Sequence, residues 1–321
     1  MKIRRRDVIV GGALAPIAAR GQLTLTGAGL PTPNGPSLDQ NFLLGTLPAA
    51  VNFTRPSSGT AFNGAGTLTS YATNVARFDY NPNTLAALGL LIEEQRTNYF
   101  LYSNAPNSWI GPQGGVTVTQ NATTSPDGAT DASSFAISAG ASTGYYYGQY
   151  LTSNTGYYTG SIWLKGTSGV VGIRIANDAG TTFAFLGVTL TSTWQRVSVT
   201  VAFLSNPIAV QFGIDNRALA GGDTAAKTVQ VFGAQIEFGA FPTSYIPTTS
   251  ATATRAADVA TLPVSSFAFN ASAGSWAAQF INEYVPSSTN PGSSEANQLQ
   301  IFRRCLLQAL ANQAQMTPVR R

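Results

Sequence analysis

A run of tyrosines offers the clearest candidate for binding chemistry in this 321-residue chain. Residues 145–150 read YYYGQY. Aromatic faces stack on the apolar side of a pyranose ring, while amides and carboxylates bind its hydroxyls. Alternate residues of a β-strand face opposite sides, so Tyr145 and Tyr147 share one face, and Tyr146 and Tyr150 share the other. One tyrosine pair is therefore expected on the surface.

Two short polar turns supply further groups for this candidate site. The complete set of candidate carbohydrate-binding residues is Tyr145, Tyr147, Gln149, Tyr150, Asn177, Asp178, Asp215 and Asn216. The alternative is that half of the tyrosines are core residues and the rest are ordinary strand surface. Trp163 and Trp194 lie in apolar alternation and are predicted to be core residues.

The adjacent carboxylates Glu93 and Glu94 are not expected to form an acid/base pair. Neighbours on a strand point to opposite faces, whereas a pair of catalytic carboxylates must flank one bond. These two residues are instead predicted to form ion pairs with Arg55, Arg77 and Arg96. Such pairs would hold the first unit of the chain together or dock it.

The composition is typical of an all-β, turn-rich protein. Only 10% of residues are charged, whereas 32 are glycine, 17 are phenylalanine and 12 are tyrosine. The sequence has no histidine, which removes the commonest general base and most zinc or iron sites. Cys305 is the single cysteine, so no intrachain disulfide forms. We therefore expect no enzyme activity.

Positive charge is concentrated at the two ends of the chain. Half of the 18 basic residues lie in residues 1–20 and 303–321. The body between them carries more acidic than basic side chains, so it offers no basic face to phosphates. Nucleic-acid binding is accordingly not expected.

The first 20 residues combine a basic start with a short apolar run from Val8 to Ala19. One interpretation is a twin-arginine-like signal, which predicts an exported, extracytoplasmic protein. The other is a flexible arm that docks the protein onto a virion. The apolar run is too short to span a bilayer, so no stable membrane insertion is expected.

Residues 98–250 contain strand candidates separated by turn signals. They are Gly144–Leu151, Tyr157–Lys165, Gly169–Ala176, Phe183–Leu190, Trp194–Phe203, Ile208–Ile214 and Thr228–Glu237. Several alternate apolar and polar side chains, which places one face on a core. Short strands without intervening helices predict an all-β fold, namely a β-sandwich or jelly roll.

Several runs resemble the head-spike fibre domain proteins of tailed phages. They are Val51–Ser58, Ala76–Pro82, Gly89–Asn98, Phe232–Ser250 and Thr254–Val259. The resemblance covers about residues 37–260. It implies a virion-associated protein of a phage, prophage or gene transfer agent, with a jelly roll similar to carbohydrate-binding modules. It also favours the docking arm for the N-terminus.

The resemblance divides the chain into four regions. They are an arm or signal-like segment with a linker at 1–36, a small β-rich attachment unit at 37–97, a carbohydrate-binding-like β-sandwich at 98–250, and a connector, strand and C-terminal helix at 251–321. Leu299, Phe302, Leu306 and Leu310 fall at helical spacing in the last region. Alternatively this region is a truncated second sandwich, because Phe267–Trp276 resembles the first strand of one.

Glu237 and the segment that begins near Asn98 resemble the structural calcium site of carbohydrate-binding jelly rolls. Calcium takes six to eight oxygen ligands, so a single carboxylate is weak evidence for a calcium site. Beyond this calcium hypothesis no cofactor is expected.

Three functions are consistent with the sequence. The leading one is a head spike or fibre of a virion that attaches to bacterial surface or capsular polysaccharide. Its expected partners are a surface glycan, capsid or other virion proteins contacted through the N-terminal region, and further copies of the chain in a homo-oligomer. The alternatives are a purely structural connector or decoration protein and an exported polysaccharide depolymerase.

Overall fold

The computed structural model describes residues 38–109, 111–112, 114–140, 145–151 and 154–267. The N-terminal arm or signal, the C-terminal helix or truncated sandwich, and Cys305 lie outside these residues. Within the described residues, no helix is long and apolar enough to cross a membrane.

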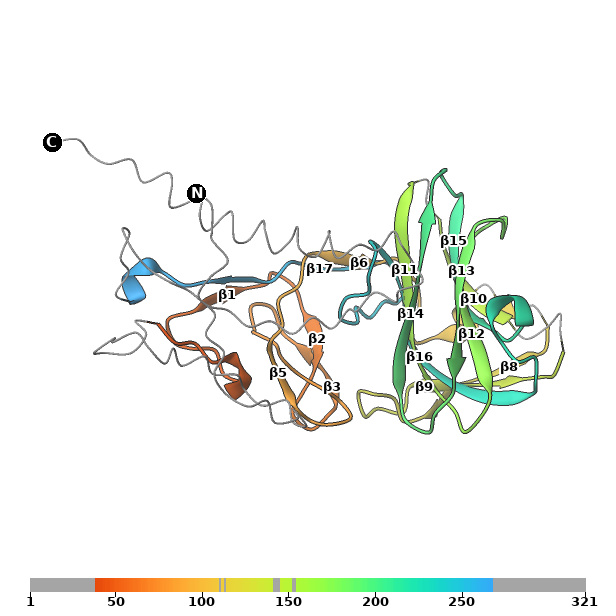
Figure 1. Ribbon diagram of the computed structural model, residues 1–321, viewed down its shortest axis with the longest axis horizontal. Coiled ribbons are helices and arrows are strands. Elements are labelled where there is room, and N and C mark those ends of the chain that lie inside the picture. Colours follow the sequence, from red (N-terminus) through yellow and green to blue (C-terminus); the bar gives the residue numbers. More distant parts are fainter. Residues whose placement is uncertain (1–37, 110, 113, 141–144, 152–153, 268–321) are drawn as a thin grey trace, which may run out of the picture. The chain divides into compact units, whose positions relative to one another are not determined.

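Two five-stranded antiparallel sheets form a β-sandwich (Figure 1). The first, here called the β12 sheet, has the order β13-β12-β15-β10-β7, and the second, the β11 sheet, has the order β14-β11-β16-β9-β8. The strands of the β12 sheet are β7 (Gly111–Pro112), β10 (Tyr145–Leu151), β12 (Val170–Asn177), β13 (Phe183–Thr189) and β15 (Ala209–Asp215). The strands of the β11 sheet are β8 (Val116–Thr123), β9 (Ala132–Ile137), β11 (Gly156–Lys165), β14 (Gln195–Phe203) and β16 (Lys227–Phe238). The predicted all-β sandwich is confirmed.

The alternating side chains of these strands build the core between the sheets. Ile173 and Ile175 of β12 are fully buried, as are Phe212 of β15 and Ile236 of β16. They belong to one continuous apolar cluster that draws on both sheets. Burial of this apolar area is the main force that holds the sandwich together.

Glycines allow close packing at two points in this core. A Cβ on Gly160 of β11 would lie 2.3 Å from the ring of Phe212 in the opposite sheet. A Cβ on Gly148, within the tyrosine run, would lie 2.2 Å from the ring of Phe100. Both positions therefore need a residue without a side chain, which explains the glycine that interrupts the tyrosines.

Residues before and after the sandwich fold together through short strand pairs. The pairs are β1 (Asn52–Thr54) with β18 (Val259–Thr261), β2 (Gly59–Phe62) with β3 (Leu68–Tyr71), β4 (Phe78–Tyr80) with β5 (Ala87–Leu90), and β6 (Arg96–Asn98) with β17 (Ala253–Arg255). In Figure 1 the blue C-terminal strands accordingly lie beside orange N-terminal ones. Residues 52–98 and residues 253–261 thus form one β-rich unit. Two domain boundaries were predicted, at residues 97 and 250, and this unit contains residues from beyond both of them.

Four 3₁₀ turns complete the described elements. They are η1 (Phe42–Leu44), η2 (Pro106–Ser108), η3 (Ala218–Ala220) and η4 (Val264–Ser266). Of the two tryptophans predicted to be core residues, Trp163 is buried, whereas Trp194 is half-buried and packs at the margin of a smaller cluster.

Candidate functional site

A shallow, open hollow of about 420 Å³ lies on the outer face of the β12 sheet. Its lining residues are Tyr147, Arg174, Asp178, Ala179, Gly180, Phe183, Gln211, Arg217 and Leu219. It combines aromatic rings, two guanidinium groups and an amide on one exposed surface. This is the combination that binds the apolar faces and the hydroxyls of sugars.

Residues that the strand pairing brings side by side form the floor of this hollow. Tyr147 pairs with Gly213, Gly213 with Arg174, and Arg174 with Phe185, so these residues form one row across four strands. Arg174 alternates with the buried Ile173 and faces outward. Because Gly213 has no side chain, the middle of the row stays low between the larger residues on either side.

The turn η3 forms one wall of the hollow. A Cβ on Gly172 of β12 would lie 2.0 Å from the carbonyl oxygen of Ala220, so the η3 backbone rests directly on the sheet. Arg217 and Leu219 lie in or next to this turn and line the hollow. Arg217 donates two hydrogen bonds to the buried Asp215, from Nε to Oδ1 at 2.8 Å and from Nη2 to Oδ2 at 2.5 Å. The carboxylate thus fixes the guanidinium in place.

The β12–β13 hairpin forms the opposite wall and holds a second guanidinium. Arg174 lies 4.7 Å from the ring centroid of Phe183 and donates a 3.3 Å hydrogen bond to the carbonyl oxygen of Gly180. Phe183 and Phe185 are exposed and stack with their centroids 6.4 Å apart. A planar donor group and a flat apolar surface are therefore presented side by side.

The predicted site residues divide between this hollow and structural positions. Tyr147 and Asp178 line the hollow, and Asp215 supports Arg217 from beneath. One carboxylate oxygen of Asp178 accepts the backbone N–H groups of Ile208 and Ala209 at 3.2 and 3.3 Å.

Two of the predicted residues have amide groups that hold loops. Asn177 closes the β12–β13 hairpin through Thr181 and Thr182. Asn216 is fully buried, where its amide donates to the carbonyl oxygen of Ala225 and accepts from Lys227.

The remaining tyrosine-run positions are placed by the register of β10. Tyr145 pairs with Asp215 and Gln149 with Gln211, on the same alternation as Tyr147. Tyr150 pairs with Val210, on the opposite alternation. The three positions 145, 147 and 149 therefore belong to the face that carries the hollow.

Five residues that line the hollow were not predicted from the sequence, namely Arg174, Phe183, Gln211, Arg217 and Leu219. For Arg174 a signal was present, because it is the only charged residue of β12 and lies between the apolar residues Ile173 and Ile175. Leu219 and Arg217 are brought to the hollow by a turn that no local pattern predicted.

The residues of the calcium hypothesis are both fully buried. The Asn98 carboxamide accepts the backbone N–H groups of Phe100 and Ile236 and donates to the carbonyl oxygen of Ile246. Glu237 accepts two hydrogen bonds from Thr243. Among the described residues, no group of three or more Asp, Glu, His or Cys side chains is arranged to hold a metal ion. Asn98 thus links β6 to β16, and Glu237 links β16 to the segment that follows it.

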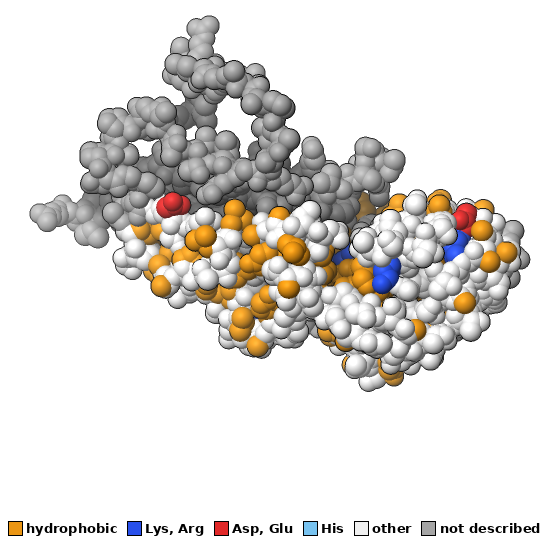
Figure 2. All heavy atoms as spheres, turned by 90° about the horizontal axis from the view of Figure 1, so that it is seen from below, with side chains coloured by type: hydrophobic (Ala, Val, Ile, Leu, Met, Phe, Trp, Pro, Cys, Tyr) orange, Lys and Arg blue, Asp and Glu red, His pale blue; other side chains and the backbone are white. Residues whose placement is uncertain are grey.

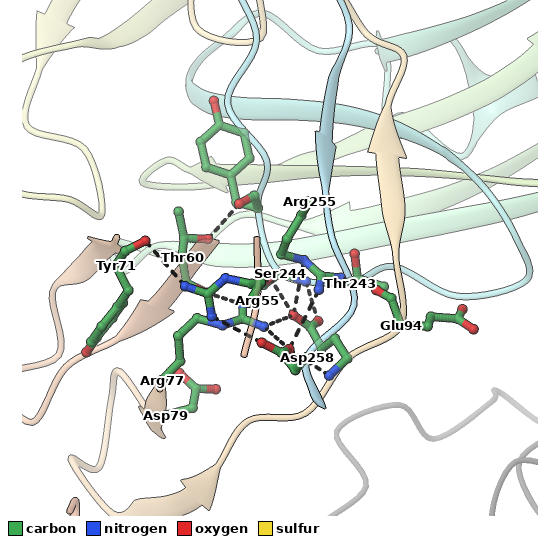
Figure 3. A network of polar contacts seen from close by, with 12 residues as sticks. Arg55, Thr60, Tyr71, Arg77, Asp79, Glu94, Thr243, Ser244, Arg255 and Asp258 are labelled. Atoms are coloured by element: carbon green, nitrogen blue, oxygen red, sulfur yellow. Dashed lines mark hydrogen bonds and ion pairs between the residues drawn. The ribbon is translucent and has the colours of Figure 1, made fainter. Parts of the chain in front are cut away.

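A cluster of buried charges joins the two ends of the β-rich unit (Figure 3). Asp258 accepts from Arg55 at 3.1 Å and from Arg77 at 2.5 Å, and all three side chains are fully buried. Glu93 lies 2.9 Å from Arg77 and 3.5 Å from Arg255. Three guanidinium groups thus share two carboxylates.

The charged cluster also contacts the segment that follows β16. Ser244 donates from its backbone N–H and its hydroxyl to Glu93, at 2.7 and 2.6 Å. Thr60 donates to the carbonyl oxygen of Tyr245 at 2.6 Å. Ion pairs were expected among Arg55, Arg77, Arg96 and the two glutamates. Arg77 pairs with Glu93 and Arg96 with Glu94, whereas Arg55 pairs with Asp258.

Two buried carboxylates, Glu93 and Glu237, should make the stability of the fold depend on pH in opposite directions. Burial opposes ionisation of Glu93, but Arg255, Arg77 and Ser244 outweigh it and hold its pKa below the ordinary 4.5. Burial raises the pKa of Glu237 above 4.5, and the hydrogen bonds from Thr243 only partly offset this. The stabilisation by Glu93 is present above about pH 4.5 and is lost as the pH falls through its lowered pKa. The stabilisation by Glu237 is present below about pH 4.5 and is lost as the pH rises through the raised pKa of this residue.

Glutamine replacements separate these effects. We expect Glu93→Gln to lower the free energy of unfolding at neutral pH by about 2 kcal/mol, because charge-assisted hydrogen bonds are lost. Glutamine is an uncharged replacement for Glu237, whose ionisation is opposed by burial. Glu237→Gln should therefore leave the free energy of unfolding at neutral pH unchanged or slightly higher than that of the wild type. Urea unfolding at pH 7 and pH 4 measures both changes. A destabilising effect of Glu237→Gln at pH 7 as large as that of Glu93→Gln would contradict the assignment.

Comparisons with known proteins find no relative by sequence. No protein-family model matches the chain, and no curated protein matches it. Among solved structures, the enzymatically active domain of bacteriophage CBA120 tailspike protein 4 matches with a TM-score of 0.32 and 10% identity, over 43% of this chain and 21% of that chain. The chain thus spans about a fifth of that structure.

Carbohydrate-binding modules match at similar levels. TmCBM61 in complex with β-1,4-galactotriose has a TM-score of 0.31 and 14% identity, over 44% of this chain and 99% of that chain. CBM6cm-2 from Cellvibrio mixtus lichenase 5A, in complex with cellotriose, has a TM-score of 0.31 and 11% identity, over 47% of this chain and 100% of that chain. At these TM-scores the likeness carries no argument about function.

Proposed function

We propose that this protein is a non-enzymatic spike or fibre component of a phage-like virion that binds a bacterial surface polysaccharide in the hollow of the β12 sheet. The observation that carries the proposal is the outward-facing row of the half-buried Tyr147 and Arg174 and the exposed Phe185, with Phe183 and Gln211 beside it. The sequence resemblance to phage head-spike proteins supports the virion location. Export through the N-terminal segment is the alternative location.

The chemistry of the hollow suits binding of sugar rings. The rings of Phe183 and Phe185 provide apolar area for the C–H face of a pyranose. The guanidinium of Arg174 and the amide of Gln211 supply hydrogen-bond donors and acceptors for hydroxyl groups. The hollow is open, so a chain of sugars can lie across it with both ends in solvent.

The lining of the hollow favours binding over hydrolysis. A glycosidase requires two carboxylates that flank the scissile bond. Of the residues that line this hollow, Asp178 is the only acidic one, and its carboxylate accepts hydrogen bonds from the backbone of the 208–209 loop. The depolymerase hypothesis would be revived by release of reducing ends from host capsule and their loss in Asp178→Asn.

The proposal is tested by two measurements on the full chain. A bacterial glycan array should show binding to a subset of surface polysaccharides, and mass spectrometry should find the protein in purified particles. Absence from particles together with no glycan binding would overturn the proposal.

A purely structural connector is the second candidate function. It is supported by the cluster of Arg55, Arg77 and Arg255 with their carboxylates, because these arginines lie in runs that resemble the head-spike proteins and form ion pairs within the β-rich unit. Incorporation into particles without affinity for any glycan would support this candidate over the first.

A further inference from the structure

One of the few lysines in this chain is buried. The lysines are Lys2, Lys165 and Lys227, and the face of the described surface shown in Figure 2 carries few positive groups. The side chain of Lys227, the first residue of β16, is only 4% exposed. Burial of an ammonium group is costly unless the group is paired, so the groups that surround this lysine matter.

Lys227 contacts an amide and a carboxylate at one end of the sandwich. Its Nζ donates a 2.5 Å hydrogen bond to Oδ1 of Asn216, which is fully buried and directly follows β15. The same Nζ donates to the carboxylate of Asp223. An amine, a carboxamide and a carboxylate are therefore held within hydrogen-bond reach of one another.

Further hydrogen bonds fix the positions of these three side chains. The Nδ2 group of Asn216 donates to the carbonyl oxygen of Ala225 at 3.0 Å, which turns Oδ1 toward Nζ. The Asp223 carboxylate accepts the backbone N–H groups of Val170 and Ala225 at 2.8 and 2.9 Å. Lys227 Nζ also donates to the carbonyl oxygen of Val170 at 2.9 Å. These contacts hold the amine against the amide.

We propose that the side chains of Lys227 and Asn216 join in a covalent amide bond in the folded protein. The Nζ atom of Lys227 attacks Cγ of Asn216. The Nζ–Cγ bond forms, the Cγ–Nδ2 bond breaks, and Nδ2 leaves as ammonium. One amide replaces another, so the step needs no oxidant, reductant or cofactor. The fold supplies the proximity that turns an amine and an acyl group into an intramolecular reacting pair.

Asp223 is the group that moves the protons. Lysine attacks only as the neutral amine. Burial raises the pKa of Asp223, but hydrogen bonds from Lys227 and two backbone N–H groups outweigh it and hold this pKa at about 2. The two residues therefore form an ion pair at rest. Asp223 passes two protons in turn from Nζ to Nδ2 and ends ionised, as it began. Because the ion pair must first be neutralised, we expect the bond to form slowly, after folding.

The bond ties the two sheets of the sandwich together. Asn216 follows β15 of the β12 sheet, and Lys227 begins β16 of the β11 sheet. The loop that the bond closes contains η3, whose neighbouring residues Arg217 and Leu219 line the hollow. A cross-link restricts the unfolded chain, so it stabilises the sandwich and holds this wall of the hollow. The proposal does not depend on whether the hollow binds a glycan.

Mass spectrometry of the full, folded chain tests the proposal. After prolonged incubation, the intact wild type should be lighter by the mass of one ammonia molecule. Trypsin should then release a branched peptide in which residues 197–217 are joined to residues 218–255, because trypsin does not cleave after a lysine whose Nζ is acylated. Fragmentation of this peptide should place the bond between Lys227 and Asn216.

Three variants identify the reacting groups. Lys227→Arg keeps the positive charge but has no amine, so it should retain its full mass. Asp223→Asn should form the bond at least about 100-fold more slowly, as expected for loss of a group that transfers protons. Lys165→Arg is the matched control, because Lys165 instead lies over the ring of Trp194, and it should lose ammonia as the wild type does.

Two outcomes would overturn the proposal. One is a folded wild type that keeps its full mass and yields no branched peptide after prolonged incubation. The other is a loss of ammonia that persists in folded Lys227→Arg, which would place the reaction elsewhere in the chain. The wild-type result decides the question even if Lys227→Arg does not fold.

Discussion

Replacement of Asp258 by alanine is expected to lower the free energy of unfolding by about 3–5 kcal/mol, as is typical when one partner of a buried ion pair is removed. Its carboxylate accepts from Arg55, Arg77 and the backbone N–H of Glu93. Without it, Arg55 loses this ion pair, and Arg77 and Arg255 are left with the carboxylate of Glu93. The cost is large because the remaining charges stay buried without compensation.

Urea unfolding followed by circular dichroism measures this loss. Asp258→Asn keeps the shape of the side chain and removes its charge. Its free energy of unfolding should therefore lie between those of the wild type and of Asp258→Ala. Glu94→Ala is the matched control, because Glu94 is 48% exposed and exposed ion pairs contribute at most about 1 kcal/mol. Equal effects of Asp258→Ala and Glu94→Ala would show that the buried cluster does not stabilise the β-rich unit.

Replacement of Phe212 by alanine should have an effect of similar size on the sandwich. Phe212 is fully buried in β15 and its ring lies 6.3 Å from that of Phe100. Truncation of a buried phenylalanine leaves a cavity and costs about 3–5 kcal/mol. The measurement is again the free energy of unfolding, with Ile208→Ala as an exposed control expected to change it by less than about 0.5 kcal/mol.

Gly160 gives this prediction a second test. Gly160→Ala alone should destabilise the wild type by about 1–3 kcal/mol, because the new methyl group meets the Phe212 ring. In a Phe212→Ala background the same change should cost much less, since the cavity accepts the methyl group. Additive effects of the two substitutions would contradict the packing of β11 against β15.

Much of the sandwich could be predicted from the sequence because its strands alternate strictly or are continuously apolar. The seven predicted strands correspond to β10 through β16 within one or two residues. The strands β7, β8 and β9 were missed, because β7 has only two residues, β8 is rich in threonine with half of its residues exposed, and β9 contains small residues. Pairing of β1 with β18 joins residues about 200 positions apart, which no local pattern specifies.

The candidate site was predicted only in part, for a related reason. The face of the sheet was predicted from the alternation of the tyrosine run, and Tyr147 lies on it. Asn216 looked like a surface turn residue but is buried, where it anchors the loop that precedes β16. Which turn covers which strand depends on backbone contacts such as that of Ala220 with Gly172, and these arise only in the folded chain.

The most direct test of the account is calorimetric titration of the full chain with fragments of a polysaccharide that it binds, compared with Arg174→Ala, Gln211→Ala and Ile208→Ala. We predict that Arg174→Ala and Gln211→Ala each weaken binding, Arg174→Ala by at least about tenfold as for a central contact residue, while Ile208→Ala binds as the wild type does. Wild-type affinity in both Arg174→Ala and Gln211→Ala would contradict the assignment of the hollow on the β12 sheet as the glycan-binding site.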